Sequence, residues 1–315
     1  MYIEDKIYGR FEVNEPVLIE LINSKAMQRL KGIAQFGIPD DFYYRKGLSR
    51  FKHSIGVFLL LRKLGASLEE QIAGLLHDVS HTAFSHVADT LWGDPTVEDF
   101  QDNKLLEILL KSDVKQILEK YNFDIYTIVE HHQFTLLEQE IPNLCADRID
   151  YTLQDLVSLG YHNLAYYLAG QLMSFDNHIV FNSLYPAQLF AEVFLDFNRR
   201  HWAGFESVSR YYQLAKILRE AIEKNIIIKD DMWKEDKYII EKLYHSNDND
   251  IIKQLDRMKG GETKIRFGIK FPKKFRYIDP QILVNNKVVI LSDVDNNYAQ
   301  KLKLEKEKSI LGMDI

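Results

Sequence analysis

The sequence predicts a mainly α-helical protein with a small β-containing C-terminal part. Apolar residues recur at helical spacing behind good helix starts through most of the chain. After about residue 245 the composition changes, and 264–271 and 284–291 are rich in β-forming residues. The second of these stretches surrounds Asn285 and Asn286, a plausible hairpin turn. The sequence contains no internal repeat and no low-complexity segment.

The N-terminal residues 2–13 are expected to form a short extended pair. A helix should follow, because Asn14 supplies a capping side chain and Pro16 stands in the first turn. We expect this helix to end near Gly37. Pro, Asp, Tyr and Gly are frequent over 38–50, which is therefore predicted to be a loop.

A second helix is predicted over 51–64, where Gly65 stops it. Ser67 begins a capping box, and the helix that it opens carries His77 and Asp78 near its end. Further helices are expected near 104–120, 124–138, 143–160, 162–173, 186–224 and 233–244.

The composition is that of an ordinary soluble globular protein, with 46% hydrophobic and 27% charged residues. A formal charge of −6 gives no overall attraction to nucleic acid or to anionic lipid, so nucleic-acid binding stays possible but unsupported. Cys145 is the single cysteine, which excludes an intrachain disulfide framework and fits a reducing cytoplasm. Its apolar neighbours favour a small buried residue over a reactive thiol.

No targeting signal is apparent at the N-terminus, where no basic segment precedes an apolar run. The apolar stretch 57–61 is far shorter than the ~20 residues that span a bilayer. We therefore expect a cytoplasmic protein without a membrane anchor.

The most informative feature is a dispersed set of four residues, His53, the adjacent pair His77 and Asp78, and Asp147. Two imidazoles and two carboxylates suit a divalent ion such as Mn, Mg, Fe, Co, Ni or Zn. Four protein ligands leave open positions for water and substrate, as hydrolysis of a phosphate ester needs. Neighbouring helical side chains point about 100° apart, so the helix should distort or stop at His77. The alternative, scattered polar residues, is disfavoured because each lies in its own distinctive segment.

These segments resemble the HD superfamily of metal-dependent phosphohydrolases, and most closely its deoxynucleoside triphosphate triphosphohydrolase (dNTPase) branch. The resemblance covers most of the chain and is carried by 28–37, 49–57, 73–89, 146–155 and the tail segment 274–286. It implies an HD-domain helical core that binds a divalent metal ion. It also implies hydrolysis of dNTPs to deoxynucleoside and tripolyphosphate by metal-activated water that attacks the α-phosphorus.

A second cluster, His81, His86 and Asp89, follows the His-Asp pair. The resemblance implies that these catalytic candidates line the pocket beside the metal. His81 would contact phosphate or act as acid or base, because the ordinary pKa of imidazole lies near neutrality. His86 and Asp89 would form a His-carboxylate pair. The alternative is a hydrogen-bonded helix cap.

One departure from the family pattern matters. Family members often carry a catalytic His-Glu step on the next helix, but the matching stretch 98–109 has no histidine. His131 and His132 could substitute or bind a second metal, or form a surface pair. The segment 197–202 joins two arginines to aromatic rings and reads equally as a phosphate or base contact and as a helix boundary.

Five further residues are expected to bind substrate: Gln35, Arg50, Arg148, Tyr151 and Asp155. A guanidinium at Arg50 can grip phosphate in bidentate fashion. By resemblance, Arg50 and Arg148 approach phosphate, Tyr151 and Asp155 the sugar, and Gln35 its 3′ side. The alternative for Arg148 and Asp155 is a surface ion pair.

We expect three regions: an HD phosphohydrolase core over 1–175, a helical extension over 176–245 and an α+β region over 246–315. A polar loop is predicted over 246–250, and the charged run 301–310 reads as a solvated helix or strand face. The family often assembles, so a homo-oligomer is expected.

The leading functional hypothesis is the dNTPase. A phosphatase or phosphodiesterase acting on nucleoside monophosphates or other phosphate esters is the alternative, motivated by the missing His-Glu step. A nucleotide-sensing or nucleic-acid-binding module with weak catalysis is the third hypothesis, and the intact ligand set argues against it.

Overall fold

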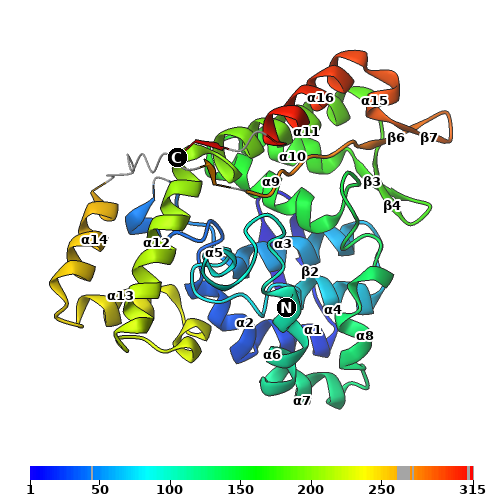
Figure 1. Cartoon of the computed structure of the whole chain (residues 1–315). Helices are drawn as coiled ribbons and strands as arrows, with labels where there is room; N and C mark the ends of the chain where they lie inside the picture. The colour runs from blue at the N-terminus through cyan, green and yellow to red at the C-terminus, as the bar shows by residue number, and fades with distance from the viewer. Residues whose placement is uncertain (44, 261–269, 272, 311–312, 315) are drawn as a thin grey trace.

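The structure, a computed structural model, describes residues 1–43, 45–260, 270–271, 273–310 and 313–314. Helices dominate it and a small mixed sheet lies at one side (Figure 1), which confirms the predicted fold class. The β-forming stretch expected at 264–271 falls, as far as 269, outside the described residues. No described helix has both the length and the apolar character needed to cross a membrane.

The chain begins with β1 (Tyr2–Asp5), β2 (Gly9–Glu12), α1 (Pro16–Asn23), α2 (Lys25–Arg29), α3 (Arg50–Lys63), α4 (Leu68–Leu76) and α5 (Val87–Trp92). The two strands pair antiparallel, as expected. The helix predicted to reach Gly37 is instead interrupted at Ser24. This residue is extended, and its hydroxyl accepts from the amide of Met27, so it caps a new helix. Helix α5 was not predicted.

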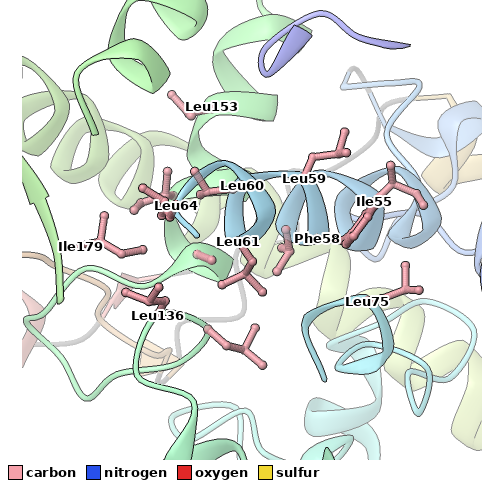
Figure 2. Close-up of a cluster of buried hydrophobic side chains, with 14 of the residues drawn as sticks. Ile55, Phe58, Leu59, Leu60, Leu61, Leu64, Leu75, Leu136, Leu153 and Ile179 are labelled. Atoms are coloured by element: carbon pink, nitrogen blue, oxygen red, sulfur yellow. The ribbon is translucent and has the colours of Figure 1, made fainter. Parts of the chain in front are cut away.

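Helix α3 is the central element of the core. Its residues from His53 to Leu61 are all buried, and Figure 2 shows Ile55 and Phe58 to Leu61 among apolar side chains of neighbouring elements. Helices α4 and α9 (Ala146–Ser158) pack against it. Gly74 permits the close approach of α4, because a Cβ there would lie 2.3 Å from a methyl of Leu61. Three helices thereby meet at one place, and the candidate metal ligands come from these helices or follow them directly.

The middle of the chain is less regular than predicted. In place of one helix over 104–120 the structure has α6 (Leu105–Lys111) and α7 (Asp113–Lys120), separated by the capping residue Ser112. Helix α8 (Ile125–Val129) ends early, so the prediction of a helix over 124–138 is wrong. Buried Glu70 explains the change, because its carboxylate accepts hydrogen bonds from the amides of two loop residues, Leu136 and Leu137.

The second half contains α10 (His162–Gly170), α11 (Leu184–Phe197), α12 (Phe205–Glu223), α13 (Asp236–Tyr244) and α14 (Asn249–Lys259). The continuous helix predicted over 186–224 is wrong, because the chain turns through a π-helical segment (Asn198–Trp202) and Gly204. The loop predicted over 246–250 contains the start of α14, since Asp248 caps it. Helices α12, α13 and α14 enclose a second buried apolar cluster at one side of the molecule (Figure 1).

A four-stranded sheet of order β3-β4-β6-β7 joins distant parts of the chain. Its strands are β3 (Leu172–Phe175), β4 (His178–Phe181), β6 (Gln281–Val284) and β7 (Lys287–Ile290). The predicted hairpin turn at Asn285 and Asn286 is confirmed, with φ angles of 50° and 58°. The β3–β4 hairpin was not predicted. Strand β4 pairs in parallel with β6 through Phe181 and Ile282, so the C-terminal part is attached to the helical body.

Short elements complete the chain: β5 (Lys270–Phe271), α15 (Leu291–Val294), α16 (Asn296–Ile310) and β8 (Met313–Asp314), with β5 pairing to β8. The charged run 301–310 lies in α16, which packs against α11 (Figure 1). The division into three regions stays a prediction.

Candidate metal centre

The four candidate ligands converge from three parts of the chain. His53 projects from α3, His77 and Asp78 follow the last residue of α4, and Asp147 lies in the first turn of α9. The Nε2 atom of His53 is 2.9 Å from Oδ1 of Asp147 and 3.3 Å from Nε2 of His77. An Asp78 oxygen lies 3.5 Å from the same nitrogen of His77. As expected, α4 ends at this pair, which lets both side chains face one point.

Hydrogen bonds fix the Nδ1 atoms of His53 and His77, so the Nε2 atom of each ring is the one that can coordinate a metal ion. His77 donates from Nδ1 to the carbonyl of Gly74 at 2.7 Å, and His53 from Nδ1 to Oδ2 of Asp150 at 2.7 Å. The donor atoms of His53, His77 and Asp147 lie within 4.8 Å of one another. Nitrogen and oxygen donors so oriented fit a divalent ion of intermediate hardness.

Asp150, which the sequence analysis missed, supports the centre from behind. It is fully buried and also accepts from the hydroxyl of Tyr8 at 2.8 Å, so the N-terminal hairpin reaches the site. Gly56 on α3 faces it directly, because a Cβ there would lie 2.0 Å from Oδ1 of Asp150. Its position three residues after Asp147, on one helix face, was the available signal.

Asp78 is held by two neighbours. Nη1 of Arg50 donates to its Oδ2 at 2.9 Å, and Nε2 of His81 lies 3.2 Å from its Oδ1. Burial would raise the pKa of Asp78, but Arg50 and the histidines hold it well below its ordinary value. Arg50 also donates from Nε to the hydroxyl of Ser85, so much of its donor capacity is used within the protein.

An unusual backbone conformation positions Ser85. Phe84 and Ser85 have φ angles of 64° and 48°, in the left-handed region that side chains rarely adopt. The amide of Phe84 donates to buried Asp236 at 2.8 Å, which holds the turn in place. The turn therefore aims the Ser85 hydroxyl at Arg50.

His86 and Asp89 form the expected His-carboxylate pair, with Nδ1 3.0 Å from Oδ2. The other Asp89 oxygen accepts from the amide of Phe100. The ring of His86 meets that of His81 edge-on at 5.0 Å. Burial, and then the charge of Arg50, lower the pKa of His81 to about 3, so its imidazole is neutral at physiological pH.

A cavity of about 530 Å³ opens beside these residues. All five predicted substrate residues line it: Gln35, Arg50, Arg148, Tyr151 and Asp155. His131 and His132 line it too. Arg148 forms an ion pair with Glu138 at 2.9 Å. The alternative prediction, an ion pair between Arg148 and Asp155, is therefore wrong.

Asp155 is already engaged on both oxygens. Arg45 binds them at 3.1 and 3.2 Å, and the indole nitrogen of Trp202 donates to Oδ2 at 2.7 Å. Tyr151 meets Trp202 edge-on. Of the segment 197–202, the aromatic end therefore lines the cavity, whereas the two arginines are exposed and pair with Asp196.

The sequence analysis missed one wall of the cavity. Glu98 and Asp102 from the stretch that lacks the family histidine line it, together with Lys273, Lys274 and Arg276 from the C-terminal segment. The signal was present, because the tail segment 274–286 resembles the family although no role had been assigned to it.

Comparison with protein families matches residues 50–155 to the HD domain. The chain is 35% identical to Uncharacterized protein YdhJ of Bacillus subtilis, over 100% of this chain and 98% of that protein. It is 30% identical to Metal-dependent phosphohydrolase cns2 of Cordyceps militaris, over 89% and 84% respectively. It is also 38% identical to Deoxynucleoside triphosphate triphosphohydrolase SAMHD1 of Bos taurus, but over only 28% of this chain and 17% of that protein.

Two solved structures have the same fold. A hypothetical protein from Aquifex aeolicus superposes with a TM-score of 0.67 at 19% identity, covering 95% of this chain and 93% of that one. A phosphohydrolase from Bacteroides thetaiotaomicron superposes with a TM-score of 0.62 at 19% identity, covering 83% and 77%.

Proposed function

The chain belongs to the HD-domain family of metal-dependent phosphohydrolases, and from this premise we propose that it hydrolyses deoxynucleoside triphosphates. In this reaction water adds to the α-phosphorus, the bond from that phosphorus to the 5′ oxygen breaks, and deoxynucleoside and tripolyphosphate leave. The single observation that carries the proposal is the convergence of His53, His77, Asp78 and Asp147 beside a cavity of about 530 Å³.

The residues around the centre have distinct roles in this proposal. His53, His77, Asp78 and Asp147 would hold a divalent ion, which lowers the pKa of water and neutralises phosphoryl charge. Asp150 keeps the His53 ring in the orientation that presents Nε2. These groups are ordered by buried hydrogen bonds, so little reorganisation is needed when substrate binds.

Proton transfer falls to the imidazoles on the cavity wall. His81 is neutral and borders both Asp78 and His86, so it can accept a proton near the phosphate and then return it as the imidazolium. Asp89 orients His86 and partly offsets the burial that lowers the pKa of that imidazole. His131, which also lines the cavity, is the candidate for the proton transfer that the missing family histidine would serve.

The dNTP assignment rests on the name of the SAMHD1 relative and on the cavity, where Tyr151 and Trp202 offer aromatic surface to a nucleoside. Nucleoside monophosphates or other phosphate esters are the second candidate. The engagement of Asp155 by Arg45 and Trp202 favours the phosphate esters without a sugar, because that carboxylate is not free to bind a sugar hydroxyl. We place the protein in the cytoplasm as a homo-oligomer, which light scattering on the purified protein would test.

Product analysis by ion-exchange chromatography tests the function. The protein is incubated with Mn, Mg, Co or Ni and each of the four dNTPs, singly and mixed. Deoxynucleoside plus tripolyphosphate is the expected result, and activity only in mixtures would indicate activation by a second nucleotide. His77→Ala and Asp78→Ala should abolish both metal binding and turnover; full activity in either variant would refute the mechanism. Orthophosphate from monophosphates alone would establish the second candidate.

A further inference from the structure

The C-terminal segment brings three cations to the cavity wall. Lys273, Lys274 and Arg276 all line the cavity. The backbone between them is anchored on both sides, because the amide of Lys274 donates to the carbonyl of Pro95 at 3.1 Å and that of Arg276 to Oδ1 of Asn198 at 3.0 Å. The segment is therefore a fixed part of the wall.

Glu98 organises two of these cations. Its side chain is 1% exposed, and one oxygen binds Lys273 while the other binds Arg276. Burial would raise the pKa of Glu98, but Arg276 and Lys273 hold it below its ordinary value. One carboxylate thus faces two cations, which leaves a surplus positive charge in a poorly hydrated wall.

The surplus positive charge is only partly balanced elsewhere in this wall. Among the described residues, no carboxylate lies within ion-pair distance of Lys274, and the buried Nη1 atom of Arg276 has no hydrogen-bond partner. Asp102, the other acid of this wall, interacts with Lys274 without a direct ion pair, and burial raises the pKa of Asp102 to about 7, so it offsets only part of the surplus. A buried cation with an unused donor is costly unless a ligand supplies the acceptor.

This wall lies close to the metal centre. The candidate ligands His77, Asp78 and Asp147 line the same cavity as Lys274 and Arg276. A phosphate chain whose first phosphorus lies at the metal centre would therefore extend within the cavity that these two cations border.

We propose that Lys274 and Arg276 form an anion subsite for phosphate groups beyond the scissile bond, with Glu98 and Lys273 as the residues that position Arg276. The substrate class is accordingly an oligophosphate ester rather than a monoester. This inference deepens the proposed function and rests on it.

The probe is inorganic tripolyphosphate, and its affinity is compared with that of orthophosphate, which has a single phosphate group. Binding to the full chain is measured by isothermal titration calorimetry in metal-free buffer, so that chelation does not contribute. We expect tripolyphosphate to bind at least about tenfold more tightly than orthophosphate, because its additional phosphates can accept charge-assisted hydrogen bonds from Lys274 and Arg276. Lys274→Ala should weaken tripolyphosphate binding by about tenfold or more.

Two further variants keep the result interpretable. Arg276→Gln removes one of the two cations that bind Glu98, so this single variant can fail to fold. In that case the double variant Glu98→Gln, Arg276→Gln, which replaces the charged pair by a neutral one, is measured instead. Exposed Lys287 on β7 provides the matched control, and Lys287→Ala should bind tripolyphosphate as the wild type does. Tripolyphosphate binding within twofold of wild type in both Lys274→Ala and the Arg276 variant would overturn the proposal.

Kinetics separate this proposal from the function on which it rests. With Mn and a dNTP, Lys274→Ala should raise KM about tenfold or more. Turnover of dNTPs with an unchanged KM refutes the subsite and leaves the triphosphohydrolase standing. Selective tripolyphosphate binding without dNTP cleavage supports the subsite and refutes the triphosphohydrolase function.

Discussion

Replacing Gly56 by alanine should loosen the metal centre without touching a metal ligand. Gly56 lies where α3 packs against α9, and its absent side chain makes room for the carboxylate of Asp150. A Cβ would lie 2.0, 2.6 and 2.8 Å from the three carboxyl atoms, where ordinary contact begins at 3.4 Å. The carboxylate must therefore move by more than an ångström, or the two helices must separate.

Either movement breaks the 2.7 Å hydrogen bond that fixes the His53 ring. Loss of such an outer partner typically costs 10- to 100-fold in metal affinity, and overpacking a core costs about 1–3 kcal/mol. We expect both effects in Gly56→Ala. Competition with a fluorescent chelator measures the Kd for Mn or Zn, and urea unfolding of the metal-free protein measures the stability change.

Gly170 is the matched control, because it also lies in a helix but nothing stands within 4 Å of the Cβ that alanine would add. Gly170→Ala should leave the Kd unchanged. Asp150→Asn keeps the size of the side chain and weakens its interaction with His53, so it carries the test if Gly56→Ala does not fold. A Kd within twofold of wild type in Gly56→Ala and Asp150→Asn would refute the claim that Asp150 controls metal affinity.

Three further outcomes test the rest of the structure. Burial raises the pKa of Asp236 to about 7, so the folded state holds a proton that the unfolded chain releases near pH 4. The stability that this group contributes is present below pH 4 and is lost as the pH rises to 7. The melting temperature should therefore fall less across this pH range in Asp236→Asn than in the wild type, and an equal fall in both proteins would contradict this. Cys145 is fully buried, so a thiol reagent should modify it only after denaturation, and rapid modification of the native protein would be contrary evidence. Leu61→Ala should lower the free energy of unfolding by about 2–5 kcal/mol in urea, since Leu61 lies fully buried in the central cluster (Figure 2), and a loss below 1 kcal/mol would count against that packing.

The parts of the fold that local chemistry determines were predictable. Ser67 caps α4 through its hydroxyl, which is half of the predicted capping box, whereas the Glu70 carboxylate binds a distant loop instead. Asn285 and Asn286 make the turn that their left-handed preference favours. The end of α4 at His77 followed from the need of two adjacent side chains to face one ion. In each case the deciding interaction lies within a few residues of the signal.

Features set by distant contacts escaped prediction. Helix α8 ends early because the loop after it is held by Glu70, more than sixty positions earlier in the chain. The break before α12 needs close packing at Gly204, and the sheet needs Phe181 to meet Ile282. No local pattern carries this information.

The same distinction applies to the candidate site. The four ligands were found because each stands in a distinctive segment, although their function as ligands stays a prediction. Asp150 could have been found from its spacing to Asp147 on one helix face. Arg276 could not, because a basic residue near the end of a chain takes on meaning only when the fold brings it to Glu98.

The order of the chain delays completion of the cavity during synthesis. The pair formed by Glu98 and Arg276 spans 178 positions. At about 5–20 residues per second, on the order of 10 to 35 seconds separate the synthesis of the two residues. Asp147, the last of the four candidate ligands, is made well before the 273–276 segment emerges from the ribosome. A nascent chain can thus gather the metal ligands early, yet it lacks the cationic wall until translation has passed that segment.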